Sequence, residues 1–344
     1  MPICTNADTD MPTGGKTPVH FLTMPGRAAH PFICTLVKFE QPLALLGLWY
    51  LTSRLLTLTL SVLGGLRCYW LSQLFPRCNL RDFGRWAIVV IEEGTLSVSY
   101  AEELARRGLD LQLIGTTSDL AILNDFCRYL QDTYRVTARV LVCGSDQGDQ
   151  TLVGCLEKKI EELESVGFLV NQMQRRPAPG SHINASDCQI SAEIRSLTWT
   201  ATLSKLVLRK MAAQGHCGVI VNISDPSGDY PHCFQAVHSA SCAFMDRFSR
   251  SLAWEVACGR IIVQSLVPDE VDEAAHAQCN LLTIKSSVLA RHAVNTLPCG
   301  RSRGYWLFAV RGFLAGCVPV WLRRYWGCYR RASCQCKCKY KCLE

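Results

Sequence analysis

The sequence predicts an α/β domain built on a doubly wound parallel sheet, with a membrane helix before it and an apolar segment after it. The chain of 344 residues is long enough for one such domain of roughly 250 residues plus extensions. From residue 86 onward, short β-branched runs alternate with stretches of helical periodicity, which is typical of parallel strands covered by helices on both faces. Residues 41–66 are apolar over more than the roughly 20 residues that a bilayer core requires.

Residues 1–40 are predicted to be disordered. They contain five prolines and no apolar block like the core of a secretory signal peptide. Asp8 and Asp10, with few arginines, are untypical of a mitochondrial transit peptide. Fifteen of the 20 cysteines lie before residue 320, mostly single and within apolar runs. We interpret them as small buried side chains and not as a disulfide framework.

Residues 41–66 are expected to form a membrane segment. Arg54 lies near the middle, at a cost of about 2.5–3.5 kcal/mol on insertion scales, which the leucines and Trp49 offset. The alternative is a helix that is buried or lies in the membrane interface. Basic residues are more frequent after this window than before it, so the positive-inside rule places the following domain in the cytosol.

The α/β domain is predicted over residues 83–300. Its strands are expected, in order, in the runs WAIVVI, LDLQLI, ARVLVC, VGFLV, GVIVNI and RIIVQSLV. Helices are expected between them, among others in YAEELARRG, DLAILNDFCRYLQDTY, CLEKKIEEL, LSKLVLRKM and FMDRFSRSLAWEVA. Strands that read as continuous apolar runs are buried on both faces, so the order predicts a doubly wound sheet.

The C-terminal region divides into two parts. Residues 304–327 are aromatic and apolar but are interrupted by Arg311 and Pro319, so we expect an interfacial segment, with a helix packed on the domain as an equal alternative. Residues 328–344 form a basic tail with five cysteines. Soft-metal binding, acylation and an unmodified tail all remain open for it.

The net charge of +7 is concentrated at the C-terminus, where residues 323–344 carry seven basic residues and one acidic residue. A nucleic-acid interface would require a basic face on the folded domain. A basic tail instead favours contact with a membrane surface or a protein partner, and we expect no nucleic-acid partner.

The first βαβ unit, FGRWAIVV followed by YAEELARRGLDLQLI, resembles that of the short-chain dehydrogenases/reductases. The likeness is to the branch of 17-beta-hydroxysteroid dehydrogenase type 3 and very-long-chain 3-oxoacyl-CoA reductase, and within it to the inactive hydroxysteroid dehydrogenase-like members. LALLGLWYLTSR resembles the membrane segment of this branch, and SASCAFMDRFSRSLAWEVACGRIIVQSLVP its catalytic helix and sixth strand. The resemblance covers residues 42–327 and implies a Rossmann-like fold whose family cofactor is NADP.

The phosphate-binding turn of that family reads TGxxxGIG, because glycines let the backbone approach the dinucleotide phosphates. In this sequence its glycine positions hold Ile91, Thr95 and Ser97, and Glu92 and Glu93 lie beside them. Three β-carbons and two carboxylates disfavour an anion at this helix N-terminus.

Three further cofactor positions also depart from the family pattern. The arginine that contacts the 2′-phosphate of NADP aligns with Thr116, and the aspartate that contacts adenine aligns with Gly144. Of the NNxG motif after the fourth strand, only Asn171 keeps its identity. These losses all point in one direction, so we expect no bound cofactor.

The catalytic Asn, Ser, Tyr and Lys of the family align with Ser196, Asp225, His238 and Cys242, so none is retained. The resemblance assigns proton exchange to the lost tyrosine and lowering of its pKa to the lost lysine. Tyr230 is a poor replacement because it lies in the loop DPSGDYPH and has no lysine four residues on.

His238 and Cys242 are four residues apart and would share one face of a helix, with Asp225 near them if the family geometry holds. Asp, His and Cys are also the components of an activated thiol nucleophile. We interpret them as the result of relaxed selection, because composition alone is weak support for a site. We expect no metal, because the sequence shows no fourth ligand.

Three hypotheses for function follow. The first is a membrane-associated pseudoenzyme with a binding or scaffold role, which could bind a lipid or steroid, a protein partner, or a second copy through the helices at residues 149–163 and 236–257. The second is an NADP-dependent reductase of steroids or 3-oxoacyl-CoA with a divergent site. The third is a degenerate gene product. The branch suggests the endoplasmic reticulum, and the inactive members suggest the mitochondrion.

Overall fold

The computed structural model describes most of the chain between residues 40 and 322. The described residues are 40–74, 80–91, 95–116, 120–142, 149–173, 186–215, 217–232, 235–257, 259–269, 271–272, 284–297, 299–319 and 322. The predicted disordered N-terminus, apart from residue 40, and the cysteine-rich tail lie outside this set, so both stay predictions. The chain divides into two units, residues 1–60 and 61–344.

The larger unit contains a seven-stranded parallel sheet with the strand order β3-β2-β1-β4-β5-β6-β9. The strands are β1 (Trp86–Val90), β2 (Asp110–Gly115), β3 (Ala138–Val142), β4 (Val166–Gln172), β5 (Gly218–Ile223), β6 (Ile261–Leu266) and β9 (Arg301–Ser302). The order reverses at β1, which pairs with both β2 and β4. This is the doubly wound arrangement that the sequence predicts, and the fold class is confirmed.

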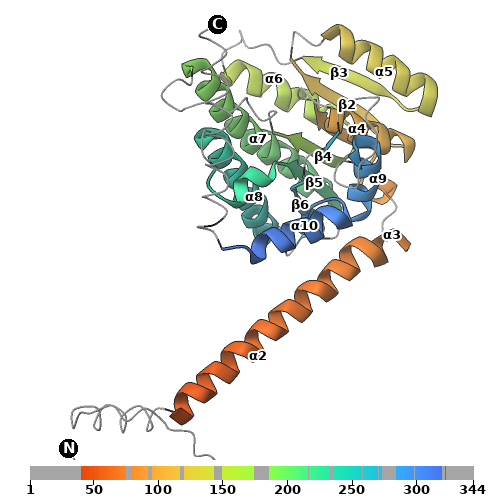
Figure 1. Ribbon diagram of the computed structural model, residues 1–344. Coiled ribbons are helices and arrows are strands. Elements are labelled where there is room, and N and C mark those ends of the chain that lie inside the picture. The colour runs from red at the N-terminus through yellow and green to blue at the C-terminus, as the bar shows by residue number, and fades with distance from the viewer. Residues whose placement is uncertain are drawn as a thin grey trace, which may run out of the picture. The chain divides into compact units, whose positions relative to one another are not determined.

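Helices cover both faces of the sheet (Figure 1). One face is covered by α4 (Thr95–Arg106), α5 (Leu120–Tyr134) and α9 (Ser286–Asn295), and the other by α6 (Asp149–Glu161), α7 (Asp187–Gln214) and α8 (Ala236–Glu255). The single turn η5 (Pro226–Asp229) follows β5 and packs against α8. A separate pair, β7 (Val271–Asp272) and β8 (Ile284–Lys285), lies outside the main sheet.

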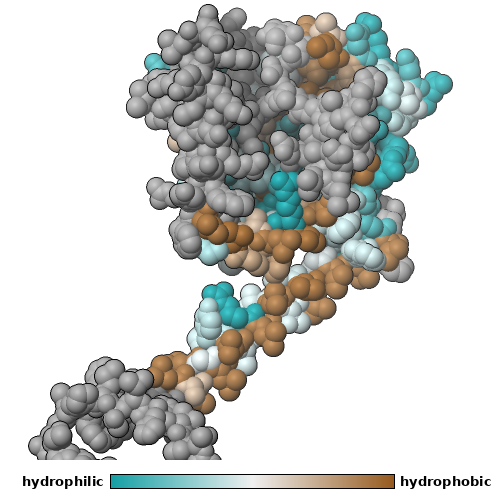
Figure 2. All heavy atoms as spheres, viewed as in Figure 1, coloured by the Kyte–Doolittle hydropathy of each residue, from teal (hydrophilic) through white to brown (hydrophobic). Residues whose placement is uncertain are grey.

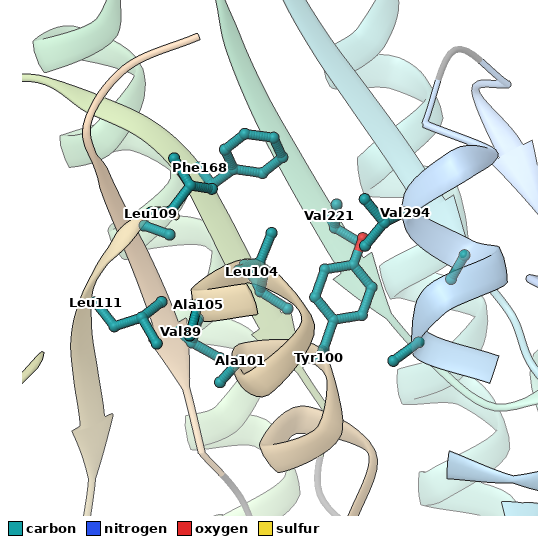
Figure 3. Packing of buried hydrophobic residues seen from close by; sticks show 14 of the residues in the cluster. Val89, Tyr100, Ala101, Leu104, Ala105, Leu109, Leu111, Phe168, Val221 and Val294 are labelled. Carbon is teal, nitrogen blue, oxygen red and sulfur yellow. The ribbon is translucent and has the colours of Figure 1, made fainter. Parts of the chain in front are cut away.

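Alternate residues of each strand contribute to the cores on the two faces. In β1, Ala87 and Val89 face the helices α4, α5 and α9, whereas Ile88 and Val90 face the opposite layer. Figure 3 shows the first core, in which the ring of Tyr100 extends from α4 toward β5 and α9. The central strands β1, β2, β4 and β5 are buried on both faces, which explains their continuous apolar sequences.

All of the segment 41–66 except its last residue lies in a helix, α2 (Glu40–Gly65), as the sequence predicts for a membrane segment. The helical chain continues through the π-helical turn η1 (Leu66–Leu71) and the short α3 (Ser72–Leu74). Residues 42–74 are long and apolar enough to cross a bilayer, and none of the most apolar window is buried. Figure 2 shows that hydrophobic side chains predominate along α2.

The end of this helical stretch attaches to the α/β domain by specific contacts. The phenolic oxygen of Tyr69 in η1 accepts a hydrogen bond from the backbone N–H of Arg303 at 2.8 Å. Gln73 in α3 donates to the carbonyl of His292 at 3.2 Å and accepts from Asn295 at 2.7 Å. Both of these partners belong to α9, so η1 and α3 are held against the domain by polar contacts.

The predicted segment 304–327 contains the helix α10 (Trp306–Cys317). Phe308 is buried and belongs to the core on the α4 side, so this helix packs on the domain. Four of its large apolar side chains are exposed, namely Trp306, Val310, Phe313 and Leu314. Figure 2 shows hydrophobic side chains gathered over this helix. The structure therefore shows a helix packed on the domain that also carries exposed apolar side chains, and contact of the segment with a membrane interface stays a prediction.

Candidate functional site

The candidate site lies at the carboxyl ends of the parallel strands, where doubly wound proteins bind ligands. Ile91 follows β1 directly, and its backbone N–H donates to the carbonyl of Ile114 at 2.8 Å. Its side chain is buried and joins the core that also contains Leu96. The glycine position of the phosphate-binding turn is thus occupied by a side chain that belongs to the core. Glu92 and Glu93 lie outside the described residues.

The next two glycine positions lie in α4. Thr95 is the first residue of this helix, and Ser97 is fully buried in its first turn. The hydroxyl of Ser97 has no hydrogen-bond partner among the described residues. Ile91 and Ser97 both carry buried side chains, whereas a pyrophosphate at these positions would require open backbone amides. The residues present do not fit a dinucleotide.

Two of the three remaining cofactor positions, Thr116 and Asn171, lie in the part of the chain that the structure describes. Thr116, directly after β2, is exposed and offers no cation for a 2′-phosphate. Gly144 lies outside the described residues. Asn171 is buried in β4, where its amide donates to Asn222 at 2.8 Å and to Ser204 at 3.2 Å. Asn171, which keeps the family identity, thus belongs to a buried hydrogen-bond network between β4, β5 and α7.

The aligned catalytic positions lie on three elements. Ser196 is half-buried in α7, and His238 and Cys242 lie one turn apart in α8 and are buried. Asp225 is the N-cap of η5, and its carboxylate accepts hydrogen bonds from the backbone N–H of Ser227 at 2.7 Å and from its hydroxyl at 2.5 Å. These contacts fix the carboxylate at the end of β5.

Gly228 lets η5 lie directly against α8. A β-carbon at this position would come within 2.7 Å of the carbonyl carbon of Cys242 and of the amide nitrogen of Ala243. Backbone atoms cannot yield at that distance, so only glycine fits. This close approach brings one ligand-type atom from each of Asp225, His238 and Cys242 within 4.8 Å of one another.

A carboxylate, an imidazole and a thiol are joined in series at this site. Glu193 of α7 is buried, and its Oε1 lies 2.9 Å from Nδ1 of His238. The other ring nitrogen, Nε2, lies 3.5 Å from Sγ of Cys242. The same Sγ lies 3.7 Å from the thioether of Met173. The carboxylate at Nδ1 fixes which ring nitrogen faces the sulfur.

Sequence reasoning identified three residues of this cluster but missed Glu193 and Met173. Glu193 precedes Ser196 by three residues and therefore shares its helix face, which was an available signal. Its position depends on α7, which begins with a capping box between Ser186 and Gln189. Met173 occupies the variable position of the altered NNxG motif, and sequence reasoning gave it no role.

Tyr230 does not replace the lost tyrosine. It follows η5 directly, and its carbonyl accepts a hydrogen bond from the hydroxyl of Ser239 at 3.1 Å. The sequence has no lysine one helical turn after it. The loop therefore does not reproduce the one-turn spacing of tyrosine and lysine that the family uses.

Ion pairs at the edge of the site connect η5 to Arg301 and Arg303, which lie in and directly after β9. Arg301 lies 2.5 Å from Asp229 and 2.9 Å from Asp246, and Arg303 lies 2.5 Å from Asp229 and 3.5 Å from Asp269. Burial raises the pKa of the Asp269 carboxyl, against the opposing effect of Arg303. The network holds Asp229, and with it the turn that carries Asp225.

Comparisons with known proteins agree with this architecture. Inactive hydroxysteroid dehydrogenase-like protein 1 from Homo sapiens is 31% identical over 83% of this chain and 88% of its own length. Very-long-chain 3-oxoacyl-CoA reductase-A from Danio rerio is 35% identical over 54% of this chain and 57% of its own length. 17-beta-hydroxysteroid dehydrogenase type 3 from Homo sapiens is 28% identical over 74% of this chain and 81% of its own length.

Solved structures show the same fold at lower identity. The bulky-bulky ketone specific alcohol dehydrogenase from Comamonas testosteroni has a TM-score of 0.53 at 22% identity, covering 68% of this chain and 95% of that protein. Acetoin dehydrogenase from Enterobacter cloacae has a TM-score of 0.56 at 18% identity, covering 65% and 96%. A family model described as short chain dehydrogenase matches residues 85–281. With this match, the 31% identity and the sheet order, the chain belongs to the short-chain dehydrogenase family.

Proposed function

We propose that this protein is a catalytically inactive short-chain dehydrogenase with a membrane-associated binding or scaffold role. The observation that carries the proposal is the replacement of the aligned tyrosine and lysine by His238 and Cys242. Both are buried and engaged with Glu193 and Met173, and neither reproduces the phenol and ammonium pair of the family. The relatives named inactive, at 30–31% identity, support the same conclusion.

The absence of a cofactor is the second part of the proposal. Ile91 and Ser97 fill the turn that would hold the pyrophosphate, and both are buried. An NADP-dependent reductase would need this turn open as well as a new proton donor. Because two independent parts of the machinery have changed, a divergent reductase is the less well supported hypothesis.

Membrane attachment is proposed through residues 41–66, with the exposed apolar side of α10 as a second contact. Helix α2 has the length and apolarity of a membrane span. The proposed membrane is that of the endoplasmic reticulum, with the domain in the cytosol, and the mitochondrion is the alternative. Cell fractionation against markers of both organelles distinguishes the two.

The domain is proposed to bind one of three kinds of partner. These are a second copy of the chain, a lipid or steroid, and another protein. Helices α6 and α8, the pair expected to dimerise, both contact α7. The stacked rings of Phe244 and Phe248 in α8 and the exposed Ile194 in α7 give this layer an apolar surface. A dimer interface would therefore involve α7 together with α8.

The proposal is tested by cofactor titration of the full chain in detergent. We expect NADPH up to millimolar concentration to leave the melting temperature unchanged, because a ligand stabilises only through its affinity for the folded state. A cofactor at 100 times its Kd would add about 2.7 kcal/mol, which is several degrees for a domain of this size. 17-beta-hydroxysteroid dehydrogenase type 3 from Homo sapiens serves as the comparison protein.

A saturable shift of several degrees with NADPH would contradict the proposal. A second readout is consumption of NADPH in the presence of a steroid ketone or a 3-oxoacyl-CoA, which we expect to equal the rate without protein. Turnover that disappears in His238→Gln would revive the reductase hypothesis.

A further inference from the structure

The cluster at the altered catalytic positions has the composition and spacing of a metal site. Asp225, His238 and Cys242 each present one ligand-type atom, and these atoms lie within 4.8 Å of one another. Thiolate, imidazole and carboxylate are the ligands that Zn²⁺ takes in proteins. They come from η5 and α8, two elements that Gly228 holds in direct backbone contact.

Two of the distances between these atoms agree with the edges of a tetrahedral zinc site. Zinc bonds of about 2.3 Å to sulfur and about 2.0–2.1 Å to nitrogen imply an N···S edge of about 3.5 Å and an S···S edge of about 3.8 Å in a tetrahedron. The observed Nε2···Sγ distance between His238 and Cys242 is 3.5 Å. The observed Sγ···Sδ distance between Cys242 and Met173 is 3.7 Å.

The thioether of Met173 is a fourth ligand-type group beside this cluster, which the sequence did not reveal. It is buried at the end of β4, and its thioether points to the sulfur of Cys242. Thiolate and thioether together favour soft ions such as Zn²⁺ and Cu⁺ over Mg²⁺ or Ca²⁺. The fold therefore adds a soft donor from a strand 69 residues away in the sequence.

Glu193 provides an independent observation in favour of a cation. Its side chain is buried, and Oε1 lies 2.9 Å from Nδ1 of His238, the nitrogen that does not face the sulfur. Its Oε2 has no hydrogen-bond partner in the part of the chain that the structure describes. A carboxylate on the outer nitrogen of a metal-bound histidine orients the ring and increases its basicity. A nearby dication would also offset the free-energy cost of burying a carboxylate that lacks a full set of hydrogen-bond partners.

We propose that Cys242 Sγ, His238 Nε2 and the Asp225 carboxylate bind one Zn²⁺ ion, with the Met173 thioether at the fourth vertex and Glu193 positioning the imidazole. Binding releases the thiol proton of Cys242, and the thiolate then bonds to the ion. The site replaces the proton-transfer groups of an active enzyme with a structural ion, and it does not depend on the membrane or scaffold role.

The test uses Co²⁺ as a spectroscopic probe of the full-length chain under anaerobic, reducing conditions. Because the tail cysteines could bind metal themselves, the reference protein carries five serine substitutions, at Cys328, Cys334, Cys336, Cys338 and Cys342. We expect one Co²⁺ per chain, the visible bands of tetrahedral cobalt, and a sulfur-to-metal charge-transfer band, all displaced by Zn²⁺.

Variants in this reference protein assign the site. Cys242→Ser should abolish the charge-transfer band, whereas Cys217→Ser, at a half-buried cysteine before β5, should leave it unchanged. Glu193→Gln should weaken Zn²⁺ affinity by about 10–100-fold, as expected of a group that acts through the histidine. Circular dichroism establishes that each variant is folded.

Three results would overturn the inference. These are the absence of a one-to-one Co²⁺ complex in the folded reference protein, octahedral bands without charge transfer, and a complex that survives Cys242→Ser at full affinity. The first of these results needs no further substitution, so it is decisive even if Cys242→Ser fails to fold.

Discussion

Ser97 shows, at the scale of one residue, how the cofactor turn has become part of the core. Family members need glycine here for close approach of the cofactor and of the helix to the strand. Ser97 keeps the small volume but adds a hydroxyl that is fully buried and has no partner among the described residues. A buried hydroxyl without a hydrogen bond costs about 1–3 kcal/mol in protein mutational data. Removing the hydroxyl of Ser97 should therefore increase the free energy of unfolding.

Ser97→Ala is expected to stabilise the domain by about 1 kcal/mol, because it removes the orphaned hydroxyl and leaves the volume nearly unchanged. Thermal unfolding of the full chain in detergent measures the effect. In an active enzyme the residues of this turn are constrained by cofactor binding. A stabilising substitution there would agree with a turn that no longer binds the cofactor.

The matched control is Ser249→Ala in α8. Ser249 is also fully buried, but it donates to the carbonyl of Met245 at 2.6 Å and accepts from Asn222 at 2.8 Å. Its removal leaves an amide donor of Asn222 unpaired, so we expect a loss of about 1–3 kcal/mol. If Ser97→Ala destabilised as much as the control, Ser97 would have a partner beyond the described residues.

His292 gives the domain a pH dependence. Burial lowers the pKa of this histidine below its ordinary value, and Arg291 lowers it further. The folded chain then binds the proton less readily than the unfolded chain. The stabilising contribution is complete above about pH 6.5, the ordinary value, and is lost as the pH falls through the lower folded value.

We expect the melting temperature to fall between pH 7.5 and pH 5.5, and His292→Gln to make this fall smaller. Arg291→Gln removes the second cause of the lowered His292 pKa, the charge of Arg291. It should reduce the slope of melting temperature against pH without abolishing it. A slope unchanged in both variants would assign the pH dependence to other groups.

At the scale of elements, α8 and η5 determine the candidate metal site. The spacing of His238 and Cys242 is a local property of any helix, and the sequence alone predicts their common face. The approach of Asp225 is not local. It results from the backbone contact at Gly228 and from the ion pairs that hold Asp229.

The short elements η1 and α3 illustrate what periodicity does not predict. The apolar window ends near residue 66, yet the helical chain continues to Leu74 as a π-helical turn and a short helix. Cys68 and Ser72 are buried there, and Tyr69 and Gln73 bond to the domain. These contacts depend on α9 and the β9 region, about 220–235 residues away, and no local pattern encodes them.

For the whole molecule, membrane attachment is the property that the sequence predicts most directly. A chain that begins at Ser61 lacks the first unit and most of α2 but retains Tyr69 and Gln73. We expect it to be released by carbonate washing, whereas the full chain stays with the membrane, because the apolar length of a spanning segment has been removed.

The matched control is the full chain with Phe313→Ser and Leu314→Ser, which makes the exposed apolar side of α10 more polar. It should remain resistant to carbonate. If the chain from Ser61 stayed with the membrane and the α10 variant were released, the anchor would be α10 and not residues 41–66.

The sequence by itself determined the order of strands and helices, because alternating apolar runs specify which residues are buried and with what period. It also predicted the loss of the phosphate-binding turn and of the catalytic set, since these are identities at aligned positions such as Ile91 and His238. Its expectation of no dinucleotide stays a prediction, which the NADPH titration tests.

Only the tertiary structure decided which of the changed residues meet. Glu193 and Met173 lie 45 and 69 residues from the side chains that they contact in α8. Periodicity gives the face on which a side chain lies but not the side chain opposite it, because that partner depends on how separate elements pack. The sequence therefore showed three ligand-type residues without a fourth, and folding brought the fourth from β4 and the supporting carboxylate from α7.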